Sequence, residues 1–176
     1  VVIVTASRNW DRAGEIYGAL AFLYGFVHSS GGKLVVRHGN ARGGDRIASA
    51  WVGIARRSGA RVQEDPHPVR PEEWVRLGKA AGPERNQRMI DLGSNVCAAF
   101  CRDESAGTTS TIDMARKARI HVWHHIYGYP APAPPTCGAT STRATRPARA
   151  STDSPSRPRA ATSSGSPRRR PCVHTR

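Results

Sequence analysis

The chain has 176 residues and a formal net charge of +14, so it is long enough to bury a sizeable core in one domain. The charge is uneven, because residues 130–176 contain nine Arg and one Asp, a net charge of +8, which leaves +6 for residues 1–129. No apolar stretch is long enough to span a bilayer, and we expect a cytoplasmic protein with no membrane partner. The four cysteines lack the spacing of a disulfide framework or a zinc site.

Five strand-like segments alternate with helical patterns before residue 127. The continuous β-branched run at Val1–Thr5 is typical of a strand that is covered on both faces. Further strands are expected at 34–36, 61–65, 95–100 and 120–123, with helices beginning near Ile16, Asp45, Glu72, Pro83 and Thr108. The alternation predicts an α/β fold, a doubly wound parallel sheet of about five strands with helices on both faces.

The segment His38–Asp45, His-Gly-Asn-Ala-Arg-Gly-Gly-Asp, connects an expected strand to an expected helix. Its glycines can adopt positive φ and let a ligand approach the backbone, while free N–H groups at a helix start attract an anion, typically a phosphate. Arg42 adds a fixed cation. The alternative is ordinary turn chemistry, with Asp45 acting only as the helix N-cap.

Three turns of unusual composition each follow an expected strand: Thr5–Trp10, Gly39–Asp45 and Arg102–Ser110. Parallel strands end at the same edge of a sheet, where ligands bind in doubly wound folds. The three turns therefore predict a phosphate site at this edge. The proline-containing segment Pro66–Ala81 has the length of a functional loop, such as a lid or one wall of the site.

From Pro130 onward, Pro, Arg, Ser, Thr and Ala dominate and large apolar residues are almost absent. Such a segment buries too little surface to offset its ordering entropy, so we expect a folded domain at 1–127 and a disordered Arg/Pro/Ser-rich tail at 128–176. Its arginines, Arg168–Arg170 included, would contact nucleic-acid phosphates non-specifically. The alternative is a solvated tail without a partner, because stacking aromatic residues are absent.

Four motifs occur in order along the chain: Thr5–Trp10, His38–Asp45, Gly78–Asn86, and Ala99-Phe100 followed by Gly107-Thr108. Together they resemble the YspA-type, YpsA-related branch of the SLOG superfamily, over roughly residues 1–123. The resemblance implies a Rossmann-like domain that binds nucleotides or nucleotide-derived ligands. It also implies kinship with the cytokinin-activating phosphoribohydrolases, called LOG enzymes, and with the DNA-processing protein DprA.

Two positions depart from the family pattern. Ala6 stands where the family usually has glycine, and Thr111 stands where the LOG enzymes carry their catalytic glutamate. The resemblance therefore implies that the phosphate-binding residues are present, whereas the catalytic glutamate of the LOG enzymes is missing.

The candidate residues come from these motifs. Those expected to bind the ligand or its phosphate are Ser7, Arg8, Gly39, Ala41, Arg42, Gly43, Gly44, Asp45, Arg85, Asn86, Gly107, Thr108 and Thr109. Trp10 is the candidate for stacking on a base, the alternative being a ring that packs under its own loop. Glu84 and Arg85 are the candidate catalytic residues. We expect no cofactor and no metal site, since the histidines at 121, 124 and 125 do not share one strand face.

These observations predict binding, sensing or processing of a nucleotide or nucleotide-derived ligand at the carboxyl edge of the sheet. One alternative is a LOG-like phosphoribohydrolase acting on nucleoside monophosphates. Another is DprA-like nucleic-acid binding aided by the basic tail. Whether the chain is an enzyme, and whether it forms a homo-oligomer, remain open at the level of sequence.

Overall fold

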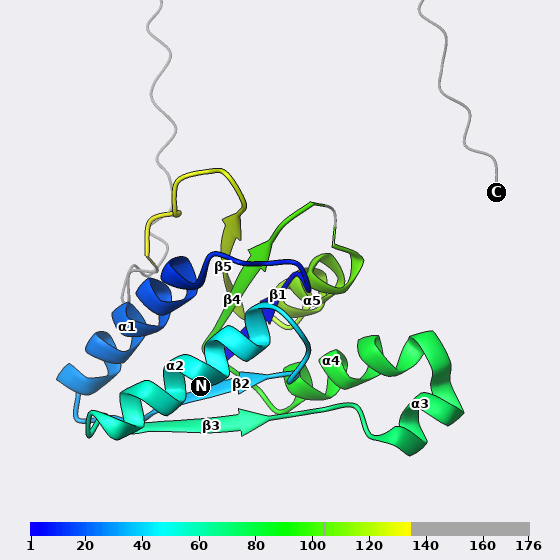
Figure 1. The fold of residues 1–176 in the computed structure, drawn as a ribbon, viewed down its shortest axis with the longest axis horizontal. Coiled ribbons are helices and arrows are strands. Elements are labelled where there is room, and N and C mark those ends of the chain that lie inside the picture. The colour runs from blue at the N-terminus through cyan, green and yellow to red at the C-terminus, as the bar shows by residue number, and fades with distance from the viewer. Residues whose placement is uncertain (104, 135–176) are drawn as a thin grey trace, which may run out of the picture. The chain divides into compact units, whose positions relative to one another are not determined.

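The computed structural model describes residues 1–103 and 105–134. Five strands form one sheet in the order β3-β2-β1-β4-β5, and every neighbouring pair is parallel (Figure 1). The strands are β1 (Val2–Ala6), β2 (Leu34–His38), β3 (Val62–Pro66), β4 (Val96–Cys101) and β5 (His121–Ile126). The predicted α/β fold with a doubly wound, Rossmann-like parallel sheet is confirmed.

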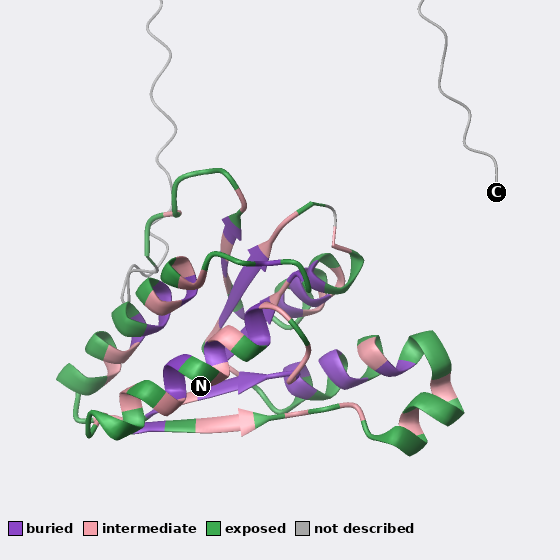
Figure 2. Cartoon of the chain, viewed as in Figure 1, coloured by how far each residue is buried: buried purple, intermediate pink, exposed green. Residues whose placement is uncertain are grey.

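The helices cover both faces of this sheet (Figure 1). They are α1 (Ala13–Ser29), α2 (Gly44–Arg57), α3 (Pro71–Leu77), α4 (Ala81–Asp91) and α5 (Ala106–Lys117), with a short 3₁₀ helix, η1 (Gly78–Ala80), between α3 and α4. Along β1, Val2 and Val4 pack with α1 and α2, whereas Ile3 packs with α4 and α5. Successive strand side chains point to opposite faces, so one apolar run serves both cores. Figure 2 shows the resulting buried central strands.

Several element boundaries differ from the sequence expectation, among them those of α4, α5 and β5. Helix α4 begins at Ala81 because η1 leads directly into it, which places Pro83 third in the helix, still within the turn that needs no backbone donor. Helix α5 begins at Ala106, ahead of the predicted Thr108. Strand β5 continues to Ile126 because its pairing with β4 extends to Cys101.

The chain leaves β1 towards α1 on one face and leaves β4 towards α5 on the other. These two loops therefore diverge at the carboxyl edge of the sheet, the position at which doubly wound folds open a crevice. Ser7 connects the loops just below the divergence, since its Oγ donates to the Arg102 carbonyl at 3.0 Å and accepts from the Arg102 amide at 2.9 Å.

In the described part of the chain, no helix has the length and apolar character needed to cross a bilayer. The Trp123 indole donates to the carbonyl of Pro132 at 3.2 Å, so the chain just beyond β5 lies against the domain. Most of the tail expected at 128–176, including Arg168–Arg170, lies outside the described residues.

Candidate functional site

A cleft of about 1200 Å³ lies at the carboxyl edge of the sheet. The loops after β1, β2 and β4 all contribute to it, together with the α3–α4 segment and the first turn of α5. The predicted site residues that line the cleft are Arg8, Gly39, Ala41, Arg42, Asp45, Arg85, Asn86, Gly107 and Thr108. The three unusual turns of the sequence therefore meet in one cavity.

The cleft is rich in positive charge. Its cationic side chains are Arg8, Arg42, Lys79, Arg85 and Arg102. Two carboxylates among the described lining residues, Asp45 and Asp103, oppose them. A concave surface with an excess of one sign of charge concentrates ligands of the opposite sign, so the cleft favours an anion.

Arg85 is the buried member of this cationic set, with a relative exposure of 8%. One terminal nitrogen donates to the carbonyl of His67 at 3.2 Å, while Nε is buried and has no partner among the described residues. The guanidinium packs against Gly39, where a Cβ atom would overlap it. Burial lowers the pKa of Arg85 and the nearby Asp45 carboxylate partly offsets this, but an arginine stays charged. A buried cation with a free donor is stabilised by an anionic partner.

Asp45 fixes the shape of the loop after β2. Its side chain is almost fully buried and Oδ2 accepts a hydrogen bond from the Ala41 amide at 3.1 Å. Burial raises the pKa of this carboxyl, against the opposing effects of the Ala41 amide and of Arg85. The N-cap of α2 is Gly43, without a side-chain cap, so the alternative role of Asp45 as N-cap is wrong.

Gly43 and Gly44 allow close packing between the start of α2 and the loop after β1, and neither is among the residues that line the cleft. Gly43 has φ of 80°, and a Cβ there would overlap the carbonyl of Arg8. A Cβ on Gly44 would overlap that of Ala6. The missing side chain at Gly44 thus makes room for the methyl group of Ala6, the residue that departs from the family pattern.

The first turn of α5 presents backbone amides to the cleft. Gly107 and Thr108 line it, and among the described residues no side chain caps the helix. First-turn amides have no acceptor within their own helix, and in the described part of the chain those of Ala106, Gly107 and Thr108 have no other acceptor. The Thr109 amide donates to the Ser105 carbonyl at 2.9 Å, and its exposed side chain is not part of the lining.

A buried polar bridge supports this turn from α4. Asn86 Nδ2 donates to Thr111 Oγ1 at 2.8 Å, and Thr111 Oγ1 donates to the Gly107 carbonyl at 2.8 Å. Thr111 is fully buried. Thr111 therefore links α4 to the first turn of α5 through two hydrogen bonds.

Three further sequence candidates lie outside the cleft lining. Trp10 is 2% exposed and makes edge contacts with Phe100 and Tyr127, at centroid distances of 5.4 and 5.5 Å. Both faces are thus unavailable to a base, and the alternative of a ring packed under its own loop is correct. Ser7 is fully buried between two loops. Glu84 is exposed and lies 3.5 Å from Arg76, outside the cleft lining.

Comparison with known proteins yields no matching family model. The chain is 39% identical over 121 residues to a protein of Mycobacterium phage D29, the "Gene 61 protein". The similarity covers 69% of this chain and 92% of the phage protein. This chain belongs to the family of the phage Gene 61 protein.

In this member of the Gene 61 family, sequence reasoning missed several lining residues. Trp74 and Lys79 come from α3 and η1, and Arg102, Asp103 and Ser105 come from the loop after β4. The first two belong to Pro66–Ala81, the segment expected to form a lid or one wall of the site, and both line the cleft. The other three belong to the turn Arg102–Ser110. Their position directly after a strand could have identified them as lining residues.

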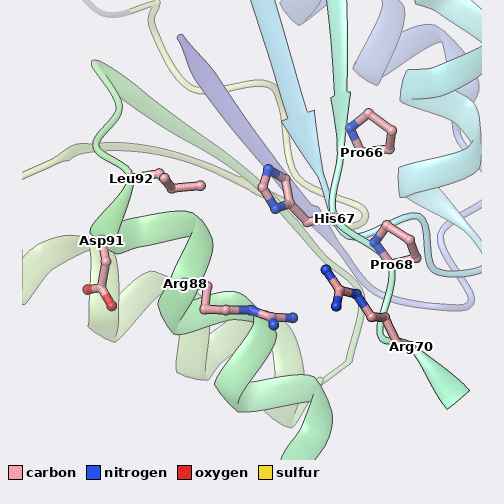
Figure 3. Close-up of a pocket in the computed structure, with 7 residues that line it drawn as sticks. All are labelled: Pro66, His67, Pro68, Arg70, Arg88, Asp91 and Leu92. Carbon is pink, nitrogen blue, oxygen red and sulfur yellow. The ribbon is translucent and has the colours of Figure 1, made fainter. Parts of the chain in front are cut away.

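A second, smaller pocket of about 640 Å³ lies between the segment that follows β3 and the C-terminal part of α4 (Figure 3). Its lining residues are Pro66, His67, Pro68, Arg70, Arg88, Asp91 and Leu92. Arg88 forms an ion pair with Glu73, and Asp91 accepts a hydrogen bond from Gln87. Arg88 and Asp91 therefore already have partners, whereas the larger cleft contains Arg85, whose Nε has none among the described residues, so the cleft is the stronger candidate for binding a charged ligand.

Proposed function

We propose that this domain binds a nucleotide or nucleotide-derived ligand, with a phosphate group between Arg85 and the first turn of α5. The observation that carries the proposal is the buried Arg85 guanidinium, which lines the cleft and keeps an unpartnered Nε–H. Burying a guanidinium that leaves one of its N–H groups without an acceptor is unfavourable. A phosphate would supply both the charge and the acceptor atoms.

Two kinds of donor belong to the lining of this cleft: the guanidinium of Arg85 and the backbone amides at the start of α5. This combination matches the oxygen atoms and the charge of a phosphate group. The cleft volume of about 1200 Å³ is far larger than an inorganic anion requires and is of the size that holds an organic ligand. A phosphate carried by a nucleoside or a similar group fits these requirements.

The motif resemblance supports the same proposal, and we propose that the chain is a YspA-type SLOG domain. Its glycine-rich loop after β2 and its α4 motif both line the cleft through Gly39 and Arg85. The proposal stops at binding, because Thr111 bridges α4 and α5 where the LOG enzymes have a catalytic carboxylate. Nucleic-acid binding by the tail remains a prediction for residues outside the described chain.

Calorimetric titration with AMP, ribose 5-phosphate and adenosine tests this function. We expect AMP and ribose 5-phosphate to bind and adenosine to bind much more weakly, because it lacks the phosphate. Arg85→Gln removes a charged hydrogen bond and should weaken AMP binding by roughly 10- to 150-fold, from the usual strength of such bonds. Arg42→Gln should also weaken AMP binding, but less. Arg42 is an exposed lining residue, so this substitution does not disturb the core.

Arg57→Gln is the matched control, since Arg57 is exposed at the opposite end of α2 from the cleft. It should leave AMP affinity unchanged, and thermal melts should show that every variant is folded. Equal binding of AMP and adenosine, or unchanged AMP binding in both Arg85→Gln and Arg42→Gln, would refute the proposal.

A further inference from the structure

Trp74 differs from the other three tryptophans of the chain. Trp10, Trp51 and Trp123 are 2%, 8% and 5% exposed, whereas Trp74 is 46% exposed and lines the large cleft. An indole ring is the largest apolar side chain, and folding normally buries it. Here the folded chain leaves a broad aromatic surface open to the cavity that holds the phosphate-binding groups.

The segment that carries Trp74 is held by polar contacts rather than by burial. Neither α3 nor η1 contains a buried residue. Glu73, next to Trp74, accepts from the Arg70 amide at 2.8 Å and forms an ion pair with Arg88 of α4. Arg76 pairs with Glu84, also of α4, at 3.5 Å. These contacts fasten α3 to α4, so the ring stays at the wall of the cleft without being part of a core.

Trp74 and Arg85 belong to the same wall but to different elements. Helix α4 begins at Ala81 and carries Arg85 about one turn, roughly 6 Å, along its axis. Trp74 lies before that start, on α3, and Lys79 of η1 lines the wall between them in sequence. The wall thus presents a cationic donor from within α4 and a flat apolar surface from the segment preceding it.

We infer that Trp74 is the stacking platform for the base of the bound nucleotide, and that the ligand carries a planar aromatic ring as well as a phosphate. This inference rests on the proposed function, because it places the base in the same cleft as the phosphate. Stacking on an indole is tolerant of base identity but grows with the ring surface. The site therefore favours a purine over a pyrimidine.

Titration of tryptophan fluorescence and calorimetry with AMP, UMP and ribose 5-phosphate test the inference. AMP should quench the wild-type emission, and ribose 5-phosphate should bind without quenching because it has no base. Trp74→Ala should weaken AMP binding about tenfold or more, from the usual contribution of base stacking, and leave ribose 5-phosphate affinity within about twofold. Trp74→Phe should retain most of the AMP affinity and lose the quenching.

Val75→Ala is the matched control, because Val75 is the next residue of α3, is 90% exposed and is not part of the cleft lining. It should change neither affinity. Equal AMP affinity of wild type and Trp74→Ala, or equal loss for AMP and ribose 5-phosphate, would overturn the stacking role and leave the proposed function intact. Failure of both AMP and ribose 5-phosphate to bind the wild type would overturn the proposed function and the stacking role together.

Discussion

The two walls of the cleft are built in different ways. The wall at the sheet edge is held by buried polar groups: Ser7 between the loops after β1 and β4, Asp45 of α2 against the loop after β2, and Thr111 of α5 between α4 and the first turn of α5. The opposite wall, α3 with η1, has no buried residue and depends on surface ion pairs. The difference indicates that the sheet-edge wall is fixed and that the opposite wall has lower local stability.

Of the substitutions considered, Gly44→Ala should lower the stability of the protein most. The new Cβ would overlap that of Ala6, and overpacking of this kind costs about 1–3 kcal/mol in the free energy of unfolding. Denaturant unfolding measures this change. The double variant Ala6→Gly with Gly44→Ala removes the overlap and should recover most of the loss, a coupling that a double-mutant cycle quantifies. Additive effects of the two substitutions would contradict the packing between α2 and the loop after β1.

The second substitution, His125→Phe, tests the packing of β5 against β4. His125 is buried, stacks on Phe100 at 4.5 Å, and neither ring nitrogen has a partner among the described residues. Burial lowers the pKa of this imidazole, with neighbouring His124 adding to the effect and Glu15 opposing it. The unfolded chain therefore takes up a proton more readily, so the stability present above about pH 6.5 declines as the pH falls below it.

The phenylalanine keeps a flat ring and removes the unpartnered nitrogens, so we expect a gain of about 1 kcal/mol that is larger at pH 5 than at pH 8. Thermal melts across this range measure it. Part of the pH dependence should persist, because burial also lowers the pKa of His124. A variant whose stability declines with acid as steeply as that of the wild type would show that His125 does not titrate in this way.

Glu73→Gln should have the smallest effect, and it tests the other wall. The Arg88 side chain and the Arg70 amide hold the pKa of Glu73 below its usual value, yet the pair lies at the surface. Exposed ion pairs contribute little to global stability, so the melting temperature should stay constant while the α3 amides exchange faster with solvent. Glu72→Gln, at the exposed neighbouring position, is the control. Unchanged α3 exchange in Glu73→Gln would show that other contacts hold this wall.

Local sequence predicted most of the architecture. The β-branched runs and helical apolar spacing gave the five strands and the main helices, because these patterns depend on residues close together in the chain. The meeting of three turns also followed from sequence, since parallel strands connected through helices end at a common edge. Boundaries were less accurate at α4, α5 and β5, where η1 and the pairing with β4 extend the elements.

Tertiary structure decided which side chains line the cleft. Sequence alone did not separate Trp10 from Trp74, because an aromatic ring after a strand and one in a proline-rich segment suit either a core or a cleft. Trp10 is enclosed by Phe100 and Tyr127, residues about 90 positions or more further along the chain, whereas Trp74 has no such cover. The roles of Gly44 and Arg85 likewise depend on contacts between distant segments, and packing between such segments exists only in the folded chain.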